Sequence, residues 1–124
     1  MLKKATFADA VEAVRNAKIL RVRAGTQHRY TGVWVVVVEG RIFVRSWSDT
    51  PTGWFRSFRE EPIGTVQVGG LEVPVRAMLT RSARLRDAVT VAFGKKYHTK
   101  ASRKWVEGFA EPARVLTTLE FVPR

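Results

Sequence analysis

The fold is decided by the stretch Val33–Phe58, which reads VWVVVVEGRIFVRSWSDTPTGWFRSF. Its opening run, Val33–Val38, is rich in β-branched residues and apolar on both faces, which predicts a central strand. Glu39 and Gly40 separate this run from Arg41–Trp47 at the two-residue spacing of a β-hairpin, and glycine takes the positive φ angle that such a turn requires. The second strand also carries apolar bulk on both faces, as expected where a strand belongs to a barrel and also to an interface or the floor of a ligand site.

Cations, hydroxyl groups and aromatic rings follow the end of that second strand. A guanidinium group gives phosphate or carboxylate a two-pronged hydrogen bond, a hydroxyl adds a donor, and an indole face stacks on a flat ring. The segment therefore predicts a site for a flat, anionic ligand, with the candidate residues Arg45, Ser46, Trp54 and Arg56 and the further cations Arg29 and Arg41. The alternative is that Trp47, Trp54 and Phe58 pack in the core while the arginines extend into solvent.

The composition limits the kinds of protein that this chain can be. Its 124 residues are expected to form a single domain over 1–124, and an apolar content of 45% with four tryptophans indicates a globular fold. The lack of cysteine excludes disulfides and thiolate chemistry, and two histidines are too few for a histidine-based metal centre. Because neither a signal peptide nor an apolar stretch of about 18 residues is present, we expect a soluble cytoplasmic protein without a membrane partner.

The formal net charge of +11 suggests an anionic partner, such as a nucleic acid, an acidic lipid or a phosphorylated small molecule. However, arginine is spread along the whole chain, and no run of five or six like charges appears. This distribution favours a generally basic composition. Nucleic-acid binding is therefore the third-ranked function.

The remaining segments predict strands joined mostly by hairpins, with a few helices. Thr6 and Asp9 have capping-box spacing ahead of a helix over 7–17, and Pro74 indicates an edge strand or a bulge. The other expected elements are a strand over Leu20–Ala24, a loop over 25–32, a short helix from Gly53 to about Glu60 capped by Thr52, strands Thr65–Val68 and Leu71–Leu79 around Gly69–Gly70, a helix between Ser82 and Lys96, a helix from Thr99 to about Gly108 that buries Trp105 and Val106, and a closing strand Val115–Val122. Six mostly antiparallel strands predict a small barrel or a strongly coiled sheet.

No group of residues predicts acid–base or nucleophilic catalysis. The eleven acidic residues form no close pair in an apolar setting, the serines lack a recognisable histidine partner, and the glycines form no dinucleotide-binding pattern. The run Lys95-Lys96-Tyr97-His98 is interpreted as cations at the negative end of a helix, followed by a buried tyrosine.

Nearly the whole chain resembles a family of small bacterial proteins known only as a domain of unknown function. The segments that carry this resemblance are Gly32–Val38, Val44–Trp47, Thr52–Arg56, Val68–Gly70, Lys96-Tyr97 and Val122–Arg124. More distantly, the chain is similar to the deazaflavin-dependent nitroreductases, a branch of the FMN-binding split barrels. In that comparison Arg29 and Gly32 fall in the first loop, Ser46 at a strand end, Trp54 at a helix start and Tyr97 near a later tyrosine.

The resemblance implies a six-stranded split β-barrel of the FMN-binding, antiparallel Greek-key type, mainly β with helices, that forms a homodimer. It implies a flavin- or deazaflavin-dependent oxidoreductase whose cofactor, FMN or deazaflavin, carries the chemistry. The implied cofactor-binding residues are Arg29, Arg45 and Ser46 for the phosphate, Trp54 and Tyr97 for the ring, and Arg56 for an acidic group. Trp47 and Asp49 stand where that family has glycines in its phosphate loop. The alternative is therefore a non-enzymatic module for an anionic or aromatic small molecule that has lost the cofactor.

Overall fold

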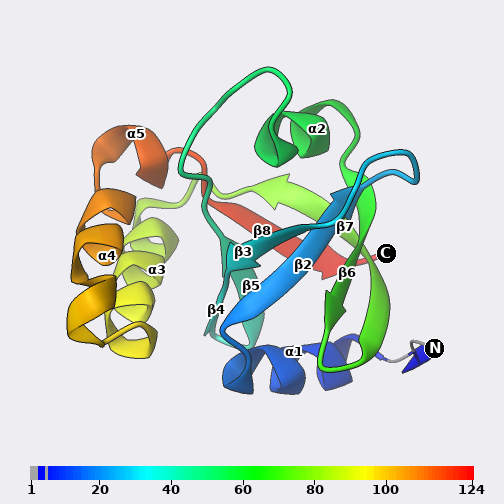
Figure 1. Cartoon of the computed structure of the whole chain (residues 1–124), viewed down its shortest axis with the longest axis horizontal. Helices are drawn as coiled ribbons and strands as arrows, with labels where there is room; N and C mark the ends of the chain where they lie inside the picture. The colour runs from blue at the N-terminus through cyan, green and yellow to red at the C-terminus, as the bar shows by residue number, and fades with distance from the viewer. Residues whose placement is uncertain (1–2, 5) are drawn as a thin grey trace.

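The computed structural model describes residues 3–4 and 6–124, and its strands form one sheet (Figure 1). Seven strands follow the order β3-β2-β6-β7-β8-β5-β4, all paired antiparallel, while β1 pairs parallel with β7. The strands are β1 (Lys3–Lys4), β2 (Ile19–Ala24), β3 (Thr31–Trp34), β4 (Val36–Val38), β5 (Arg41–Val44), β6 (Ile63–Val68), β7 (Leu71–Leu79) and β8 (Leu119–Pro123). The helices are α1 (Phe7–Asn16), α2 (Trp54–Glu60), α3 (Ala83–Lys96), α4 (Arg103–Phe109), α5 (Pro112–Val115) and a 3₁₀ turn, η1 (Lys100–Ser102).

The sheet curls into a nearly closed barrel. Strands β3 and β4 stand at the two ends of the sheet order, yet only Val35 separates them in the chain. The first and last strands are therefore brought together, which leaves little exposed edge. A mainly antiparallel barrel with helices is confirmed, but the expected number of six strands is wrong, because the run Val33–Val38 is not one strand.

The break in that run has a cause in the backbone hydrogen bonds of Val35. Its N–H donates to the hydroxyl oxygen of Tyr97 at 3.0 Å, and its carbonyl accepts from the amine of Lys96 at 2.8 Å. Because the end of α3 occupies both polar groups of this residue, they are not available to a neighbouring strand. The strand ladder is therefore interrupted at a residue that is itself completely buried.

Both tight hairpins expected from the sequence are confirmed. Glu39 and Gly40 have φ angles of 55° and 71°, and Gly69 and Gly70 have φ angles of 55° and 76°. Positive φ at both central residues is the turn geometry that matches the twist of two adjoining strands. These turns set the register of β4 on β5 and of β6 on β7.

Pro74 lies within β7 at a point where the strand changes partner. It faces Thr65 on β6, but on the other side of β7 the described pairing with β1 ends at Glu72 and the pairing with β8 begins at Val75. A residue without an N–H is tolerated at such a gap in the ladder. The expected edge strand is therefore wrong, because β7 lies between β6 and β8, and the missing N–H of Pro74 is accommodated at this local gap.

The helix ends agree with the sequence in part. The capping box of Thr6 and Asp9 is formed, and the hydroxyl of Ser82 accepts from the N–H of Leu85 at the start of α3. The expected cap at Thr52 is wrong, because α2 begins one residue later with Gly53 as its N-cap. The expected strand start at Val115 is also wrong. A proline at the first position of α5 suits a helical turn, so this part of the chain is helical.

Two apolar clusters hold these elements together, and β5 contributes to both. Ile42 and Val44 point into the barrel, where Phe58 and Phe121 meet edge to face with ring centres 5.2 Å apart. Phe43 points the other way, into a second cluster between β4, β5 and α3. Apolar bulk on both faces of this strand is thus confirmed. Figure 1 shows α1 beneath one end of the barrel, α2 above the other, and α3 with α4 packed beside it. No helix in the described part of the chain is both long and apolar enough to cross a bilayer.

Candidate ligand-binding site

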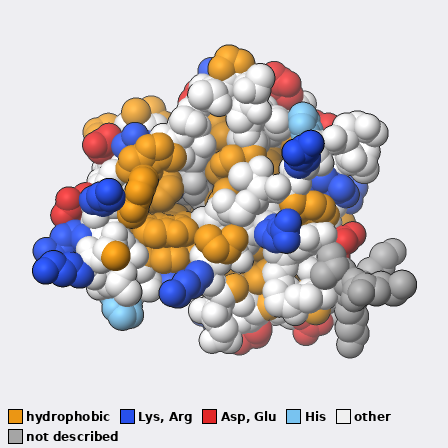
Figure 2. All heavy atoms as spheres, in the orientation of Figure 1, with side chains coloured by type: hydrophobic (Ala, Val, Ile, Leu, Met, Phe, Trp, Pro, Cys, Tyr) orange, Lys and Arg blue, Asp and Glu red, His pale blue; other side chains and the backbone are white. Residues whose placement is uncertain are grey.

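A groove rich in tryptophan lies between the barrel and the helices beside it. Its volume is about 330 Å³, and its lining comprises Gly32, Val33, Trp34, Arg45, Trp47, Trp54, Trp105 and Phe109. These residues come from β3, from the segment after β5, and from α2 and α4. Figure 2 shows hydrophobic side chains gathered on this face between the α3–α4 pair and β3, with lysines and arginines around them.

The rings around the groove are held in fixed orientations by one another. Trp34 lies flat on Tyr97, with 3.9 Å between ring centres and 2° between planes. Trp47 meets Phe109 edge to face at 5.3 Å and Trp105 at 5.0 Å. Offset or edge-to-face contacts of this kind favour one arrangement of the rings. The groove is therefore preorganised for a flat ligand.

Trp47 is the ring that joins the groove to the helices. The guanidinium of Arg114 lies 3.6 Å from its ring centre and donates to its backbone carbonyl at 2.8 Å. On the α4 side the ring rests against Gly108, where an added Cβ would come within 2.2 Å of it. Even so, 39% of Trp47 and 42% of Trp105 remain exposed, so the expected burial of Trp105 is wrong. Two neighbouring exposed indoles are typical of a binding surface.

Arg45 lies beneath the groove, but its hydrogen-bond donors are directed into the protein. It is 2% exposed, and four hydrogen bonds lead from its guanidinium to the Thr118 and Thr90 hydroxyls and to the carbonyls of Phe109 and Arg86, at 2.7–3.0 Å. Burial, assisted by the nearby charge of Arg86, lowers the pKa of Arg45 to about 10. The group is thus cationic at neutral pH and ties α3 and α4 to Thr118, the residue just before β8, beneath the groove.

Ser46 and Tyr97 are likewise engaged with protein groups. Ser46 is buried, its hydroxyl donates to the Ser48 carbonyl, and its N–H donates to the hydroxyl of Thr117 at 2.9 Å. The hydroxyl of Tyr97 accepts from Val35 and donates to the Lys18 carbonyl, and burial raises the pKa of Tyr97 to about 12. Neither side chain lines the groove. Tyr97 instead supports the face of Trp34 that points away from it.

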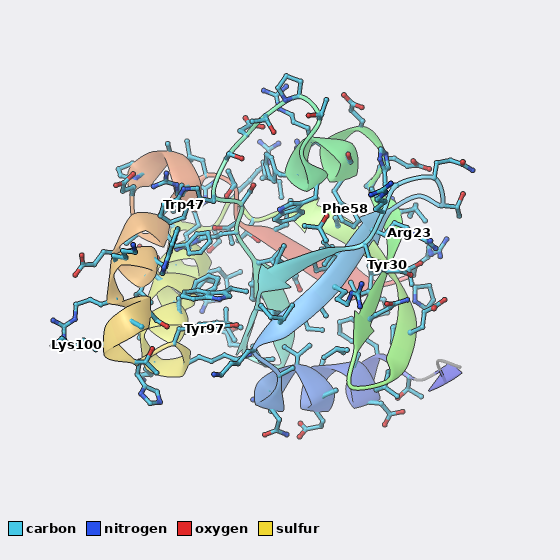
Figure 3. The ribbon with its side chains drawn as sticks, viewed as in Figure 1. Arg23, Tyr30, Trp47, Phe58, Tyr97 and Lys100 are labelled. Carbon is cyan, nitrogen blue, oxygen red and sulfur yellow. The ribbon has the colours of Figure 1, made fainter. Side chains whose placement is uncertain are left out.

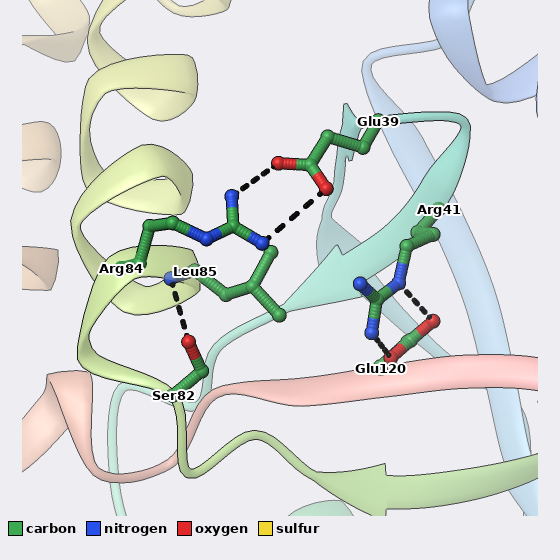
Figure 4. A network of polar contacts seen from close by, with 6 residues as sticks. All are labelled: Glu39, Arg41, Ser82, Arg84, Leu85 and Glu120. Carbon is green, nitrogen blue, oxygen red and sulfur yellow. Dashed lines mark hydrogen bonds and ion pairs between the residues drawn. The ribbon is translucent and has the colours of Figure 1, made fainter.

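Two of the expected cations form ion pairs elsewhere. Arg56 is exposed and paired with Asp49, which raises the pKa of the arginine further. Arg41 makes a two-pronged contact with Glu120 at 2.8 and 2.7 Å and thereby links β5 to β8 (Figure 4). Neither arginine reaches the groove.

A smaller, polar pocket of about 160 Å³ adjoins the groove at Trp54, which lines both cavities. Arg29, a predicted site residue, lies on this pocket, and the rest of its lining is Val22, Arg23, Ala24, His28, Thr31, Thr52 and Ser57. The guanidinium of Arg23 lies 4.6 Å from the ring centre of Tyr30, and these two side chains are adjacent in Figure 3. The Nε of Arg23 is buried without a hydrogen-bond partner among the described residues. An orphaned cationic donor is a feature that an anionic ligand would satisfy.

The structure thus brings three of the predicted site residues, Arg29, Arg45 and Trp54, to two adjoining cavities. Sequence reasoning missed Arg23, Trp34 and Phe109. A polar residue at the end of β2, just before the Gly25–Tyr30 loop, was the available signal for Arg23. Trp34 could not be distinguished from an ordinary core residue of its strand.

Comparisons with solved structures show that the fold is shared with known proteins. One is described as "Putative Pyridoxamine 5'-phosphate oxidase" from Listeria innocua, with a TM-score of 0.64 and 12% identity over 95% of this chain and 93% of that chain. Another is a conserved hypothetical protein from Mycobacterium tuberculosis, with a TM-score of 0.64 and 14% identity over 97% and 81%. A third is a FAD-binding protein from Mesorhizobium loti, with a TM-score of 0.55 and 12% identity over 94% and 87%. At such identities the likeness concerns the fold alone.

Two comparisons were made with sequences. No curated protein matches the chain. A family model with the description "Uncharacterized protein conserved in bacteria (DUF2255)" matches residues 9–121.

Proposed function

Since the chain belongs to the DUF2255 family of uncharacterized bacterial proteins, we propose its function from the site described above. The ligand is a flat aromatic molecule with an anionic group, and the first candidates are a flavin and a deazaflavin. The observation that carries the proposal is the groove of about 330 Å³ bounded by four tryptophans. Cavities that hold small molecules start at about this volume and are lined mostly by apolar and aromatic side chains with a few polar groups. A planar ring system matches the indoles, which ring contacts already hold in fixed orientations.

The anionic part of the ligand is assigned to the polar pocket that shares Trp54 with the groove. Arg45 and Ser46 do not fit a phosphate, because their donors are bonded to protein acceptors. Arg23 fits better, since it lines this pocket together with Arg29 and His28, and its Nε is not bonded to any described residue. Thr31 and Thr52 supply hydroxyl donors beside them.

A bound flavin or deazaflavin would supply hydride transfer, and the chain's own residues would hold its ring and exclude water. The described residues that line the groove include no carboxylate, histidine or tyrosine. Proton transfer by a groove side chain is therefore not part of the proposal. Two solved structures of the same fold, one named as an oxidase of a phosphorylated pyridine and one as FAD-binding, support a redox cofactor at the level of the fold.

The proposal is tested by titrating the purified protein with FMN, riboflavin and a reduced deazaflavin, while flavin fluorescence and the absorption spectrum are recorded. We expect binding in the micromolar range or tighter. Trp105→Leu, which removes an exposed groove ring, should weaken it about tenfold, whereas Val91→Ala, an exposed apolar residue on the outer side of α3, should not. Arg29→Gln should weaken FMN but not riboflavin, which lacks the phosphate, and Arg81→Gln is the matched control. A folded protein that binds none of the three compounds rules the proposal out.

A non-enzymatic binding module is the second candidate, favoured by the lack of a proton donor among the described groove residues. In that case the same groove holds a different anionic or aromatic small molecule. Mass spectrometry of compounds that co-purify with the protein distinguishes the two functions. The first predicts a flavin or deazaflavin, and the second predicts a different anionic or aromatic compound. A groove that retains nothing and responds to no ring compound counts against both.

We also propose that the protein forms a homodimer, as the resemblance to split barrels implies. Trp47 and Trp105 retain 39% and 42% of their exposure, and a second copy would cover them. Light scattering on a sizing column measures the mass directly. A monomer at micromolar concentrations would exclude a stable dimer.

A further inference from the structure

Lys96, at the end of α3, places its amine in a separate pocket at the junction of α1, β4 and α3. This pocket has a volume of about 390 Å³ and is lined by Arg15, Val36, Val37, Ala92, Lys95 and Lys96. None of these residues lines the tryptophan groove. The site is therefore independent of the function proposed above.

The two hydrogen bonds of Lys96 are compatible with a neutral amine. Its Nζ donates to the carbonyl of Val14 at 2.9 Å and to the carbonyl of Val35 at 2.8 Å. An ammonium group has three donors, whereas a neutral amine has two N–H groups and one lone pair. The two carbonyls use the two N–H groups of the neutral form. The remaining position of the nitrogen, the lone pair, is then free to face a molecule in the pocket.

Burial of this amine also favours the neutral form. Desolvation by burial lowers the pKa of Lys96 to about 8. Arg15 of α1 and Lys95 of α3 add positive charge, and Arg15 is itself bonded to Glu12 at 3.1 Å. From β4 the apolar residues Val36 and Val37 line the pocket, and from the end of α3 the ring of Tyr97 lies 5.5 Å from the amine. Among the described residues no carboxylate lines the pocket, so the ammonium form has no ion-pair partner there.

We propose that Lys96 is a nucleophilic lysine that captures an anionic carbonyl compound, such as a phosphorylated or carboxylated aldehyde, as a reversible imine. The pocket supplies three things that such a ligand requires: an amine with an accessible lone pair, two cations for the anionic group, and an apolar wall. Arg15 and Lys95 recognise the anion, and Val36, Val37 and Ala92 contact the carbon skeleton.

The reaction is a condensation without oxidation or reduction. The lone pair of Nζ attacks the carbonyl carbon and forms the C–N bond. The carbonyl oxygen then leaves as water with the two hydrogens of the amine. A proton taken up by the imine nitrogen restores one donor, which can bond to one of the two backbone carbonyls. The other carbonyl loses its partner, which keeps the adduct reversible.

The experiment uses pyridoxal 5'-phosphate as the probe, with cyanoborohydride to trap the imine and peptide mass mapping to locate it. At pH 7.5 about a quarter of an amine with a pKa of about 8 is neutral, compared with about 0.1% for an ordinary lysine. We therefore expect Lys96 to be labelled at least tenfold faster than Lys95, Lys100 and Lys104. Arg15→Leu should slow the labelling by the phosphorylated aldehyde and leave labelling by pyridoxal unchanged.

These measurements are made on the unmodified protein and on surface variants, so they do not depend on a Lys96 variant that folds. Lys100→Met, at an exposed position outside the pocket, serves as the control and should retain labelling at Lys96. Equal labelling of all lysines, or protection of Lys96, would show that its amine has only a structural role and would overturn the proposal. Fast labelling of Lys96 that ignores both the phosphate and Arg15 would overturn the assignment to an anionic ligand.

Discussion

The hydroxyl of Tyr97 accepts a hydrogen bond of 3.0 Å from the N–H of Val35, a residue 62 positions earlier in the chain. The same hydroxyl donates to the carbonyl of Lys18, so one oxygen links α3 to the β3–β4 break and to the segment before β2. Its ring meanwhile supports Trp34 in the groove. The geometry of the groove and the interruption of the barrel strand thus depend on the same side chain.

Tyr97→Phe should destabilise the protein by about 1–3 kcal/mol, because it leaves the buried N–H of Val35 without an acceptor while the ring is kept. Urea unfolding followed by circular dichroism measures the change. Tyr30→Phe is the matched control, since the hydroxyl of Tyr30 is buried without a partner among the described residues, and its removal should not destabilise the protein. Equal losses in the two variants would contradict the role given to the Tyr97 hydroxyl.

The same contact shows where sequence reasoning stops. The hairpins could be predicted because their turn residues, Glu39-Gly40 and Gly69-Gly70, encode the turn locally. The break at Val35 could not, since the run VWVVVV is uniform and the groups that interrupt it come from the far end of α3. Tertiary contacts overrode a strong local preference for one long strand.

The site was predictable to a similar extent. Tryptophan and arginine after a strand drew attention to the segment that contains Trp47 and Trp54, and both of these residues line the groove. What could not be derived is which cations are free, because an arginine bonded inside the protein and one that faces a ligand look alike in the sequence. The guanidinium of Arg45 is bonded to Thr118 and Phe109, residues far away in the chain, whereas the Nε of Arg23 has no partner among the described residues.

Arg45→Lys tests the structural role of the buried guanidinium. Lysine keeps the charge but has a single donor centre, so most of the contacts to Thr90, Thr118 and two backbone carbonyls are lost. We expect a loss of about 3 kcal/mol or more in the free energy of unfolding. Arg81→Lys, at an exposed position, should change it by less than about 0.5 kcal/mol. A stable Arg45→Lys protein that merely binds FMN less well would instead assign Arg45 to the ligand.

Gly108→Ala tests the close approach of Trp47 to α4. An added Cβ would lie 2.2 Å from the indole, so the ring must move, and overpacking of this kind costs about 1–3 kcal/mol. Gly94→Ala is the control within a neighbouring helix. Its Cβ would meet the side chain of Val106 at 3.9 Å, an ordinary contact, and alanine should stabilise α3 by about 0.5–1 kcal/mol. Thermal unfolding and near-ultraviolet circular dichroism measure both effects, and a Gly108→Ala protein with unchanged tryptophan signals would show that the ring is not held there.

The end of α3 also predicts an unusual dependence of stability on pH. Burial lowers the pKa of Lys96 from 10.5 to about 8, so between these values the unfolded chain holds more protons than the folded chain and the free energy of unfolding rises with pH. Tyr97 has the opposite effect. Its pKa is raised from 10.0 to about 12, so above about pH 10 the unfolded tyrosine loses its proton first and stability falls.

Urea unfolding between about pH 7 and about pH 11.5 should therefore give a maximum of stability near about pH 10. Lys96→Met should remove most of the rise on the acidic side of that maximum, and Tyr97→Phe most of the fall on its alkaline side, because each variant removes one of the two titrating groups. Each variant is compared with the unmodified protein by the slope of its curve, so a constant loss of stability does not affect the result. A slope between pH 8 and 10 that is the same with and without Lys96 would show that its amine is not desolvated in the folded state.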